Sequence, residues 1–248
     1  MSFQDQVIVV TGGNSGIGRG IVNRFHAEGA KVVVFGRNSE TLAETVNALG
    51  ERTLAVTGDV ARLDDLKNLA AEVKQEFGHI DHLVVNAGIA QPAPIEDVDE
   101  AAYDTTMNIN LKGAFFTIQQ ALPLMREGST ITLIASAVVN KGFANFSVYS
   151  ASKAGLRSFA RTLSAELVPR GIRVNTINPG PIETPIFDKM GIPEDQVAAT
   201  KDGFSEYVPL KRMGNVEEIA GIATFLAGSD GTYLTGIEIN ADGGLTDI

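Results

Sequence analysis

The chain of 248 residues has no cysteine, no tryptophan and only three histidines. Without cysteine it can form no disulfide, no thiolate nucleophile and no cysteine-ligated zinc or iron–sulfur centre. Basic residues are outnumbered, because 20 Lys and Arg stand against 30 Asp and Glu, which gives a net charge of −10. This balance argues against a protein that binds nucleic acid or an anionic membrane through its overall charge.

Long hydrophobic runs are also missing. Residues 1–6 are polar and lead directly into a four-residue apolar run, far shorter than a signal peptide or a transmembrane helix requires. We therefore expect a cytoplasmic protein with no membrane partner. The length suits one α/β domain that spans residues 1–248.

Short β-branched runs alternate with longer segments of helical period, which is typical of βαβ units and a buried parallel sheet. The expected strands are Val7–Val10, Val32–Phe35, Leu54–Thr57, Leu83–Val85, Ile131–Ile134, Val174–Ile177 and Ile237–Ile239. The expected helices are at about 16–28, 39–49, 62–77, 99–125, 148–168 and 215–228. The pattern predicts a doubly wound α/β fold with a seven-stranded parallel sheet and helices on both faces.

The stretch from Pro179 to Gly214 departs from this alternation. It holds five prolines and is too long for a simple connection. A disordered insertion is the alternative, but its apolar residues argue against a solvated tail. These apolar residues are Ile182, Ile186, Phe187, Met190 and Phe204. We interpret residues of about 181–214 as a substrate loop or lid.

A glycine-rich turn follows the first strand, with the spacing G-x3-G-x-G. Glycines between a strand and a helix let backbone N–H groups and the helix N-terminus approach a pyrophosphate. The spacing is a variant of the commoner G-x-G-x-x-G pattern, and a turn without a ligand is the alternative. The predicted phosphate-binding residues are Gly12, Asn14, Ser15, Gly16, Ile17 and Gly18.

The end of the second strand reads Gly36-Arg37-Asn38, with no carboxylate to accept a ribose 2′-hydroxyl. The Arg37 guanidinium could instead pair with a 2′-phosphate, which favours NADP(H) over NAD(H), unless Arg37 is simply an exposed residue at a helix start. Asp59, with Val60 beside it, is predicted to contact the adenine, although Asp59 could equally cap a helix.

A small-residue opening follows the fourth strand, at the carboxyl edge where open α/β sheets bind ligands. It consists of Asn86, Ala87 and Gly88, and we expect all three to contact a cofactor.

Tyr149 and Lys153 are four residues apart on a predicted helix and therefore share one face. A fixed positive charge favours phenolate, and lowering a phenol pKa by roughly three units corresponds to about 4 kcal/mol. Alone, this pair would be an ordinary surface pair. Ser136 at the end of the fifth strand, and Asn110, an amide in the middle of a helix, change that interpretation.

Taken together in this order, these motifs resemble the short-chain dehydrogenase/reductase family in its compact form of about 250 residues. The resemblance covers essentially the whole chain and continues through Pro179-Gly180 to Asp242-Gly243-Gly244. It implies a single-domain Rossmann-type fold and hydride transfer between NADP(H) and a carbonyl or alcohol substrate.

The family resemblance implies four catalytic roles. Tyr149 would be the general acid in carbonyl reduction and the base in alcohol oxidation, and Ser136 would hydrogen-bond the reacting oxygen. Lys153 would bind the nicotinamide ribose and lower the Tyr149 pKa, while Asn110 would hold a proton-relay water. Tyr149 and Lys153 thus also count as cofactor contacts. The nicotinamide end would be held by Pro179, Gly180, Ile182 and Thr184.

The substrate pocket is expected to be apolar, lined by Val138, Phe143 and Phe146. This composition suits a neutral ketone, aldehyde or alcohol, although Lys141, Lys189 or Lys211 could serve an anionic one. One alternative is a 3-oxoacyl-thioester reductase acting on an acyl carrier protein. Another is a non-catalytic dinucleotide sensor, but such a protein would be free to lose Tyr149 or Lys153.

Two further expectations concern assembly and metals. Apolar helix faces and the family resemblance suggest a homo-oligomer, with a tetramer favoured and a dimer as the alternative. The residues of these faces are Phe115, Phe116, Phe159 and Leu163. His79 and His82 have no third ligand near them in the sequence, so we interpret them as surface residues and expect no metal site.

Overall fold

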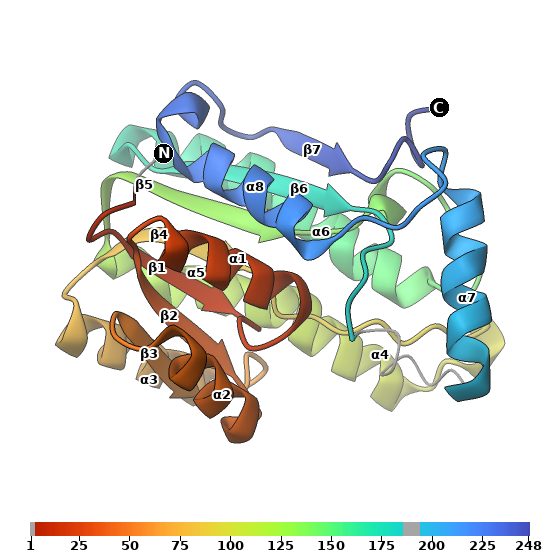
Figure 1. Cartoon of the computed structure of the whole chain (residues 1–248), viewed down its shortest axis with the longest axis horizontal. Helices are drawn as coiled ribbons and strands as arrows, with labels where there is room; N and C mark the ends of the chain where they lie inside the picture. The colour runs from red at the N-terminus through yellow and green to blue at the C-terminus, as the bar shows by residue number, and fades with distance from the viewer. Residues whose placement is uncertain (1–2, 186–193) are drawn as a thin grey trace.

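The computed structural model describes residues 3–185 and 194–248. Within them, one parallel sheet contains seven strands in the order β3-β2-β1-β4-β5-β6-β7 (Figure 1). The strands are β1 (Val7–Thr11), β2 (Lys31–Gly36), β3 (Thr53–Thr57), β4 (Ile80–Val85), β5 (Met125–Ile134), β6 (Arg173–Pro179) and β7 (Glu238–Ala241). The predicted parallel sheet is confirmed, because β-branched apolar runs form strands that are covered on both faces.

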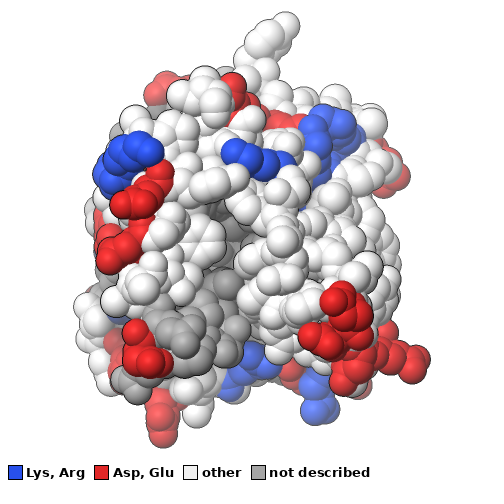
Figure 2. Space-filling view, turned by 90° about the vertical axis from the view of Figure 1, so that its right-hand side faces the viewer, with Lys and Arg blue, Asp and Glu red and all other residues white. Residues whose placement is uncertain are grey.

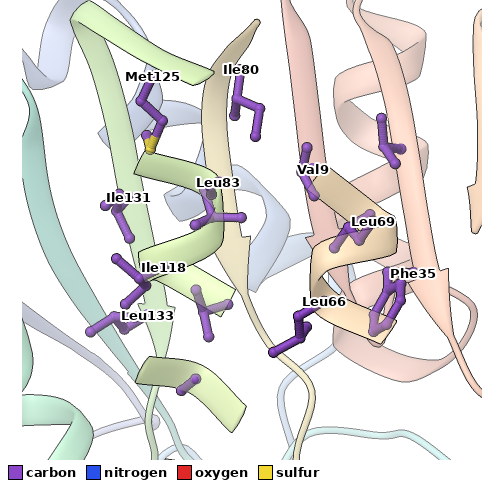
Figure 3. Packing of buried hydrophobic residues seen from close by; sticks show 14 of the residues in the cluster. Val9, Phe35, Leu66, Leu69, Ile80, Leu83, Ile118, Met125, Ile131 and Leu133 are labelled. Atoms are coloured by element: carbon purple, nitrogen blue, oxygen red, sulfur yellow. The ribbon is translucent and has the colours of Figure 1, made fainter. Parts of the chain in front are cut away.

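Helices cover both faces of the sheet, as a doubly wound fold requires. On one face lie α1 (Gly16–Ala27), α2 (Ser39–Leu49) and α8 (Val216–Ala227). On the other lie α3 (Leu63–Glu76), α5 (Gly113–Ala121) and α6 (Ser147–Leu167). Alternate residues of one strand enter the two cores. Val9 belongs to the core beneath α3 and α5, where it lies near Leu69 of α3 (Figure 3). Ile8 and Val10 belong to the core beneath α1 and α8.

The strand order reverses at β1, whose two neighbours are β2 and β4. Such a reversal opens a crevice at the carboxyl ends of the strands, where ligands of open α/β sheets bind. The buried Thr11 hydroxyl joins the two sides, since its Oγ1 accepts from the N–H groups of Asn86 (3.1 Å) and Ala87 (3.2 Å). The turns after β1 and β4 are therefore held next to each other.

The single helix expected at 99–125 was wrong in detail. The chain forms α4 (Glu100–Met107), a π-helical turn (Asn108–Lys112), α5 and a short 3₁₀ turn (Leu122–Leu124), and β5 begins at Met125. Where α5 starts, Gly113 lies so close to the core that a Cβ would be 2.9 Å from the Val60 carbonyl oxygen. The π-helical turn immediately precedes this contact, and such turns are frequent at functional sites.

The predicted loop of about 181–214 contains a helix, α7 (Glu194–Tyr207), which lies at the end of the sheet toward which the strands point (Figure 1). Its sequence has little apolar periodicity and an internal Gly203, so periodicity did not reveal it. A parallel bridge between Ile182 and Gly214 joins the two ends of this segment. Three of its predicted apolar residues, Ile186, Phe187 and Met190, lie outside the described residues.

His82 is buried, not at the surface as predicted, because it lies in the central strand β4. Its Nδ1 is 2.8 Å from Thr130 Oγ1, its Nε2 is 2.6 Å from Gln6 Oε1, and the rings of Phe3 and Phe25 lie beside it. Burial lowers the pKa of His82 to about 4. This histidine is therefore neutral in the folded protein at physiological pH.

His79 lies in the turn before β4, where its Nε2 is 3.1 Å from Asp81 Oδ2. Across the described ranges, no group of three or more His, Asp or Glu is arranged to hold a metal ion. In the same part of the chain, none of the helices has the length and apolar character needed to cross a membrane.

Candidate active site

The turn after β1 has a shape that only glycine permits. Gly12 and Gly16 have φ angles of +64° and +50°, in the left-handed region that L side chains rarely adopt. A Cβ at Gly18 would overlap with the Gly12 carbonyl oxygen. Asn86 holds the turn from the end of β4, since its Nδ2 donates to the carbonyls of Thr11 (3.0 Å) and Gly12 (3.2 Å). The Asn86 amide is thus committed to shaping the turn.

The N-terminus of α1 is left available to an anion. Its N-cap, Ser15, makes no side-chain capping bond, and the first turn of the helix carries no acidic residue. The free N–H groups and the positive end of the helix dipole therefore suit a phosphate. Asn14 has a different task, because its Nδ2 donates to Thr41 Oγ1 (2.6 Å) and links the turn to α2.

Tyr149 and Lys153 both face one cavity from α6. The Lys153 side chain is only 4% exposed, and its Nζ donates to the Ile134 carbonyl oxygen at the end of β5 (2.8 Å). The same Nζ lies 5.8 Å from the centroid of the Tyr149 ring. Ser136, two residues beyond Ile134, forms a hydrogen bond with Tyr149. The structure thus brings the predicted phenol, ammonium and hydroxyl together.

The protonation of this cluster differs from the expectation. Burial raises the pKa of Tyr149, opposed by its hydrogen bond with Ser136, and burial lowers the pKa of Lys153 to about 8. The expected lowering of the Tyr149 pKa by Lys153 is therefore wrong for this structure. The apolar surroundings disfavour phenolate, and the ammonium is directed at a carbonyl oxygen. At neutral pH Tyr149 keeps its proton.

Asn110 lies in the π-turn and is completely buried. Its Oδ1 accepts from the N–H of Ile89 (2.9 Å), and its Nδ2 donates to the Ile89 carbonyl (2.9 Å) and to Ser152 Oγ (3.0 Å). A Cβ at Gly88 would lie 3.2 Å from Asn110 Oδ1 and 3.3 Å from Lys153 Nζ. The Asn110 side chain therefore braces the cavity wall and α6, and the proton-relay water remains a prediction.

The cavity has a volume of about 280 Å³ and connects the glycine turn to the Tyr149 cluster. The predicted pocket residues Val138, Phe143 and Phe146 line it. So do the predicted cofactor residues Gly12, Ser15, Gly16, Ile17, Asn86, Ala87, Gly88, Pro179, Gly180, Ile182 and Thr184. Leu245 also lines the cavity, although it was not among the residues predicted from the sequence. The signal in the sequence was the Gly243-Gly244 pair just before it, which indicates a turn of the chain at this point.

Comparison with known proteins agrees with this geometry. The family model described as "Enoyl-(Acyl carrier protein) reductase" matches residues 12–246. The chain is 37% identical to glucose 1-dehydrogenase of Gluconobacter oxydans over 253 residues, which covers 98% of this chain and 93% of the relative. This chain belongs to the short-chain dehydrogenase/reductase family. It is accordingly an oxidoreductase that acts on a carbonyl or alcohol group.

Two solved structures of similar proteins contain a nicotinamide cofactor. A 3-ketoacyl-(acyl-carrier-protein) reductase from Brucella melitensis complexed with NADH is 28% identical, with a TM-score of 0.91, covering 99% of this chain and 100% of that one. A single-residue variant of actinorhodin polyketide ketoreductase with NADPH is 30% identical, with a TM-score of 0.90 and full coverage of both chains. This short-chain dehydrogenase/reductase is therefore NAD(P)H-dependent.

The residues present fit such a dinucleotide. The left-handed glycines and the uncapped start of α1 form a cradle of backbone N–H groups for the pyrophosphate. Beyond the cradle, Lys153, Ile182 and Thr184 line the cavity where the nicotinamide half would extend. Among the described residues, the lining offers one ammonium and several backbone N–H groups and no carboxylate, a donor set that matches a polyanion with a polar ring amide.

Four predicted residues of the adenine end are not among the described residues that line this cavity: Arg37, Asn38, Asp59 and Val60. The Arg37 side chain is 65% exposed, and its Nη1 is 4.0 Å from Asp59 Oδ2. Asn38 caps α2, because its Oδ1 accepts from the N–H groups of Glu40 (2.9 Å) and Thr41 (3.1 Å). Arg37 thus supplies an exposed cation after β2, although Asp59 partly offsets its charge.

Asp59 and Val60, in the turn after β3, have local structural roles. Asp59 Oδ1 accepts from the N–H of Ala61 (2.9 Å), and the N-cap of α3 is Arg62, so the helix-capping alternative for Asp59 was wrong. Val60 is buried and packs against Gly113. The side chain of Val60 therefore belongs to the core that positions the π-turn.

A polar network behind the cavity was missed by sequence reasoning. Glu238 Oε1 on β7 accepts from Arg157 and Arg161 of α6, each at 2.8 Å, and its Oε2 accepts from Asn178 Nδ2 at the end of β6 (3.1 Å). Arg157 lies one turn beyond Lys153, so this network ties the catalytic helix to both strands. No spacing rule could find it, because the partners are 60 to 81 residues apart.

Proposed function

We propose that this enzyme is an NADPH-dependent carbonyl reductase that interconverts a neutral ketone or aldehyde with its alcohol. The observation that carries the proposal is one cavity in which the glycine turn, the Ser136–Tyr149–Lys153 cluster and an apolar wall meet. A phosphate cradle alone would suit a sensor. The partly buried proton donor beside it is what a catalyst requires.

The side chains divide the chemistry between them. A dinucleotide held by the glycine turn and Lys153 would supply the hydride to the carbonyl carbon. The Tyr149 hydroxyl then donates its proton to the carbonyl oxygen, and its raised pKa keeps that proton in place at neutral pH. Ser136 steadies the same oxygen by a hydrogen bond, and Lys153 holds the ribose end of the cofactor. Tyr149 regains its proton from solvent, so the net uptake is one hydride and one proton.

A neutral substrate is favoured by the lining and by the surroundings of the cavity. Phe143, Phe146 and Phe204 contribute apolar rings. Of the lysines considered for an anionic substrate, Lys141 donates to the Leu245 carbonyl and Lys211 to the Glu206 carbonyl, while Lys189 lies outside the described residues. Figure 2 shows the α7 end of the molecule, where the described residues that border a hollow are mainly uncharged.

The alternative, reduction of a 3-oxoacyl thioester on an acyl carrier protein, calls for a basic surface that docks an acidic partner. On the face drawn in Figure 2, the Lys and Arg groups are few and form no continuous patch, and Asp and Glu share the same face. The test is NAD(P)H oxidation on a panel of neutral ketones, aldehydes and 3-oxoacyl thioesters, with both cofactors. We expect turnover of neutral ketones, and turnover of the thioesters alone would support the alternative.

Exchanging Arg37 for Asp should reverse the charge that favours NADPH. Loss of a charge-assisted phosphate contact corresponds to roughly 2 kcal/mol, so the ratio of kcat/KM for NADPH over NADH should fall at least about tenfold. Arg62→Asp, an exposed residue after β3 with the same charge change, should leave the ratio unaltered. An unchanged ratio in Arg37→Asp would refute the assignment.

We also propose a homotetramer assembled through the faces of α5 and α6. The Phe115 side chain is 39% exposed, and its ring lies 5.3 Å from Phe116 and 5.7 Å from Phe159 (centroid distances). Phe116, Phe159 and Leu163 are partly buried against the core, so Phe115 offers the most accessible apolar surface of the four.

Light scattering at micromolar concentration should therefore give four times the chain mass of 26.2 kDa. Phe115→Asp should lower this mass, because a charge buried in an interface without a partner is costly. A monomeric mass for the wild-type protein would contradict the proposal.

A further inference from the structure

Three segments of the outer cavity wall meet at one lysine. Lys141 lies in the loop between β5 and α6, and its Nζ donates to the Leu245 carbonyl in the C-terminal segment (3.1 Å). The same ammonium lies 4.9 Å from the centroid of the ring of Tyr207, the last residue of α7. One cation thus bridges a loop, a helix and the end of the chain, which are remote from one another in sequence.

The partners of Lys141 border the substrate pocket. Leu245 lines the cavity, and so does Phe204, which precedes Tyr207 by about one turn of α7. Phe143 also lines it, and its ring contacts that of Tyr207 at a centroid distance of 6.3 Å. A shift of Tyr207 would therefore move apolar groups on two sides of the pocket.

The C-terminal end of α7 has a second anchor that does not involve Lys141. The N–H of Leu210 donates to the Gly243 carbonyl (3.2 Å), and Val208 packs tightly against Gly243. This anchor joins α7 to the C-terminal segment. Lys141, together with Phe143, joins the same helix end to the loop that follows Ser136. Loss of Lys141 should therefore loosen one side of the wall without releasing the helix.

We propose that Lys141 is a positioning residue that sets the outer wall of the pocket and thereby the affinity for bulky apolar carbonyl substrates. The proposal rests on the proposed function above. Lys141 binds wall atoms, not substrate, so it acts through Tyr207 and Leu245. Its ammonium forms a charge-assisted hydrogen bond and a cation–π contact, and Met, which is similar in length, can form neither.

The kinetic test compares Lys141→Met with Lys141→Arg at saturating NADPH, with 2-tetralone as the bulky probe and acetone as the small one. Lys141→Met should raise KM for 2-tetralone about tenfold and leave kcat and the KM for acetone nearly unchanged. Lys141→Arg should restore the wild-type KM, because a guanidinium can make both contacts. Lys67→Met on α3 is the control for loss of one exposed lysine. An equal loss for both substrates, or a change confined to kcat, would overturn the proposal.

Hydrogen exchange provides a readout that does not depend on turnover. In Lys141→Met, the backbone amides of residues 197–207 of α7 should exchange about tenfold faster than in the wild type, while Lys141→Arg and Lys67→Met should match it. Unchanged exchange in Lys141→Met would overturn the proposal. Faster exchange in a protein that reduces no neutral ketone would instead support the Lys141 contact and refute the proposed function.

Discussion

Tyr149→Phe is expected to lower kcat for carbonyl reduction by about a thousandfold, because general acid catalysis of this kind contributes typically 10²–10⁴. The substitution removes only the hydroxyl that hydrogen-bonds Ser136. The ring keeps its edge contact with Phe146, at a centroid distance of 5.9 Å, so the wall of the cavity should persist. The measurement is kcat at saturating NADPH, together with NADPH affinity by fluorescence titration.

Tyr103→Phe supplies the matched control, because Tyr103 lies on α4 and its side chain is exposed. This variant should turn over at the wild-type rate, and NADPH affinity should be nearly unchanged in both variants. Tyr149→Phe with more than a tenth of the wild-type kcat would exclude Tyr149 as the proton donor. Loss of NADPH binding in that variant would mean that the hydroxyl serves the cofactor.

The free energy of unfolding should fall by about 3 kcal/mol between pH 6.5 and pH 4 because of His82. Burial lowers the pKa of His82 in the folded protein to about 4, from 6.5 in an exposed histidine. In this window the unfolded chain binds a proton that the folded chain does not, so stability decreases as pH falls. Well below pH 4 both states are protonated at this site, and its contribution stops changing.

Urea unfolding at a series of pH values measures this effect. His82→Gln keeps groups that can hydrogen-bond Thr130 and Gln6 but does not titrate, so the decrease in stability from pH 6.5 to pH 4.5 should be much smaller in this variant. His26→Gln is the control, because His26 lies at the surface, where its Nε2 contacts the Glu51 carbonyl oxygen. The stability of this variant should depend on pH as the stability of the wild-type protein does. The same pH dependence in His82→Gln would show that other groups cause the acid sensitivity.

The architecture was predictable because its signals are local. A strand covered on both faces is a short apolar run, and the seven expected runs all became strands. The phosphate-binding turn could be predicted from its glycines, because a sharp turn before a helix excludes side chains at Gly12, Gly16 and Gly18. The four-residue spacing of Tyr149 and Lys153 likewise follows from helix geometry alone.

Features that depend on burial or on distant partners were not predictable. His82 was expected at the surface and lies in the core, and burial raises the pKa of Tyr149 where the spacing to Lys153 suggested the opposite. Helix α7 was not predicted because its sequence lacks a clear helical period of apolar residues. Contacts with segments remote in sequence hold its C-terminal end instead. Asn110 was noticed as an unusual mid-helix amide, but its partners Ile89 and Ser152 are 21 and 42 residues away.

The sequence by itself therefore determined the seven strands, most of the helices, the glycine turn and the shared helix face of Tyr149 and Lys153. These depend on periodicity and spacing over a few residues. The roles expected of Ser136 and Asn110 came from the resemblance to the short-chain dehydrogenase/reductase family. Only the tertiary structure decided which titratable groups are desolvated and which segments close the pocket, as the contact of Lys141 with Leu245 across 104 residues shows. The reason is that the low-dielectric surroundings that shift a pKa, and the contacts between remote segments, exist only in the folded chain.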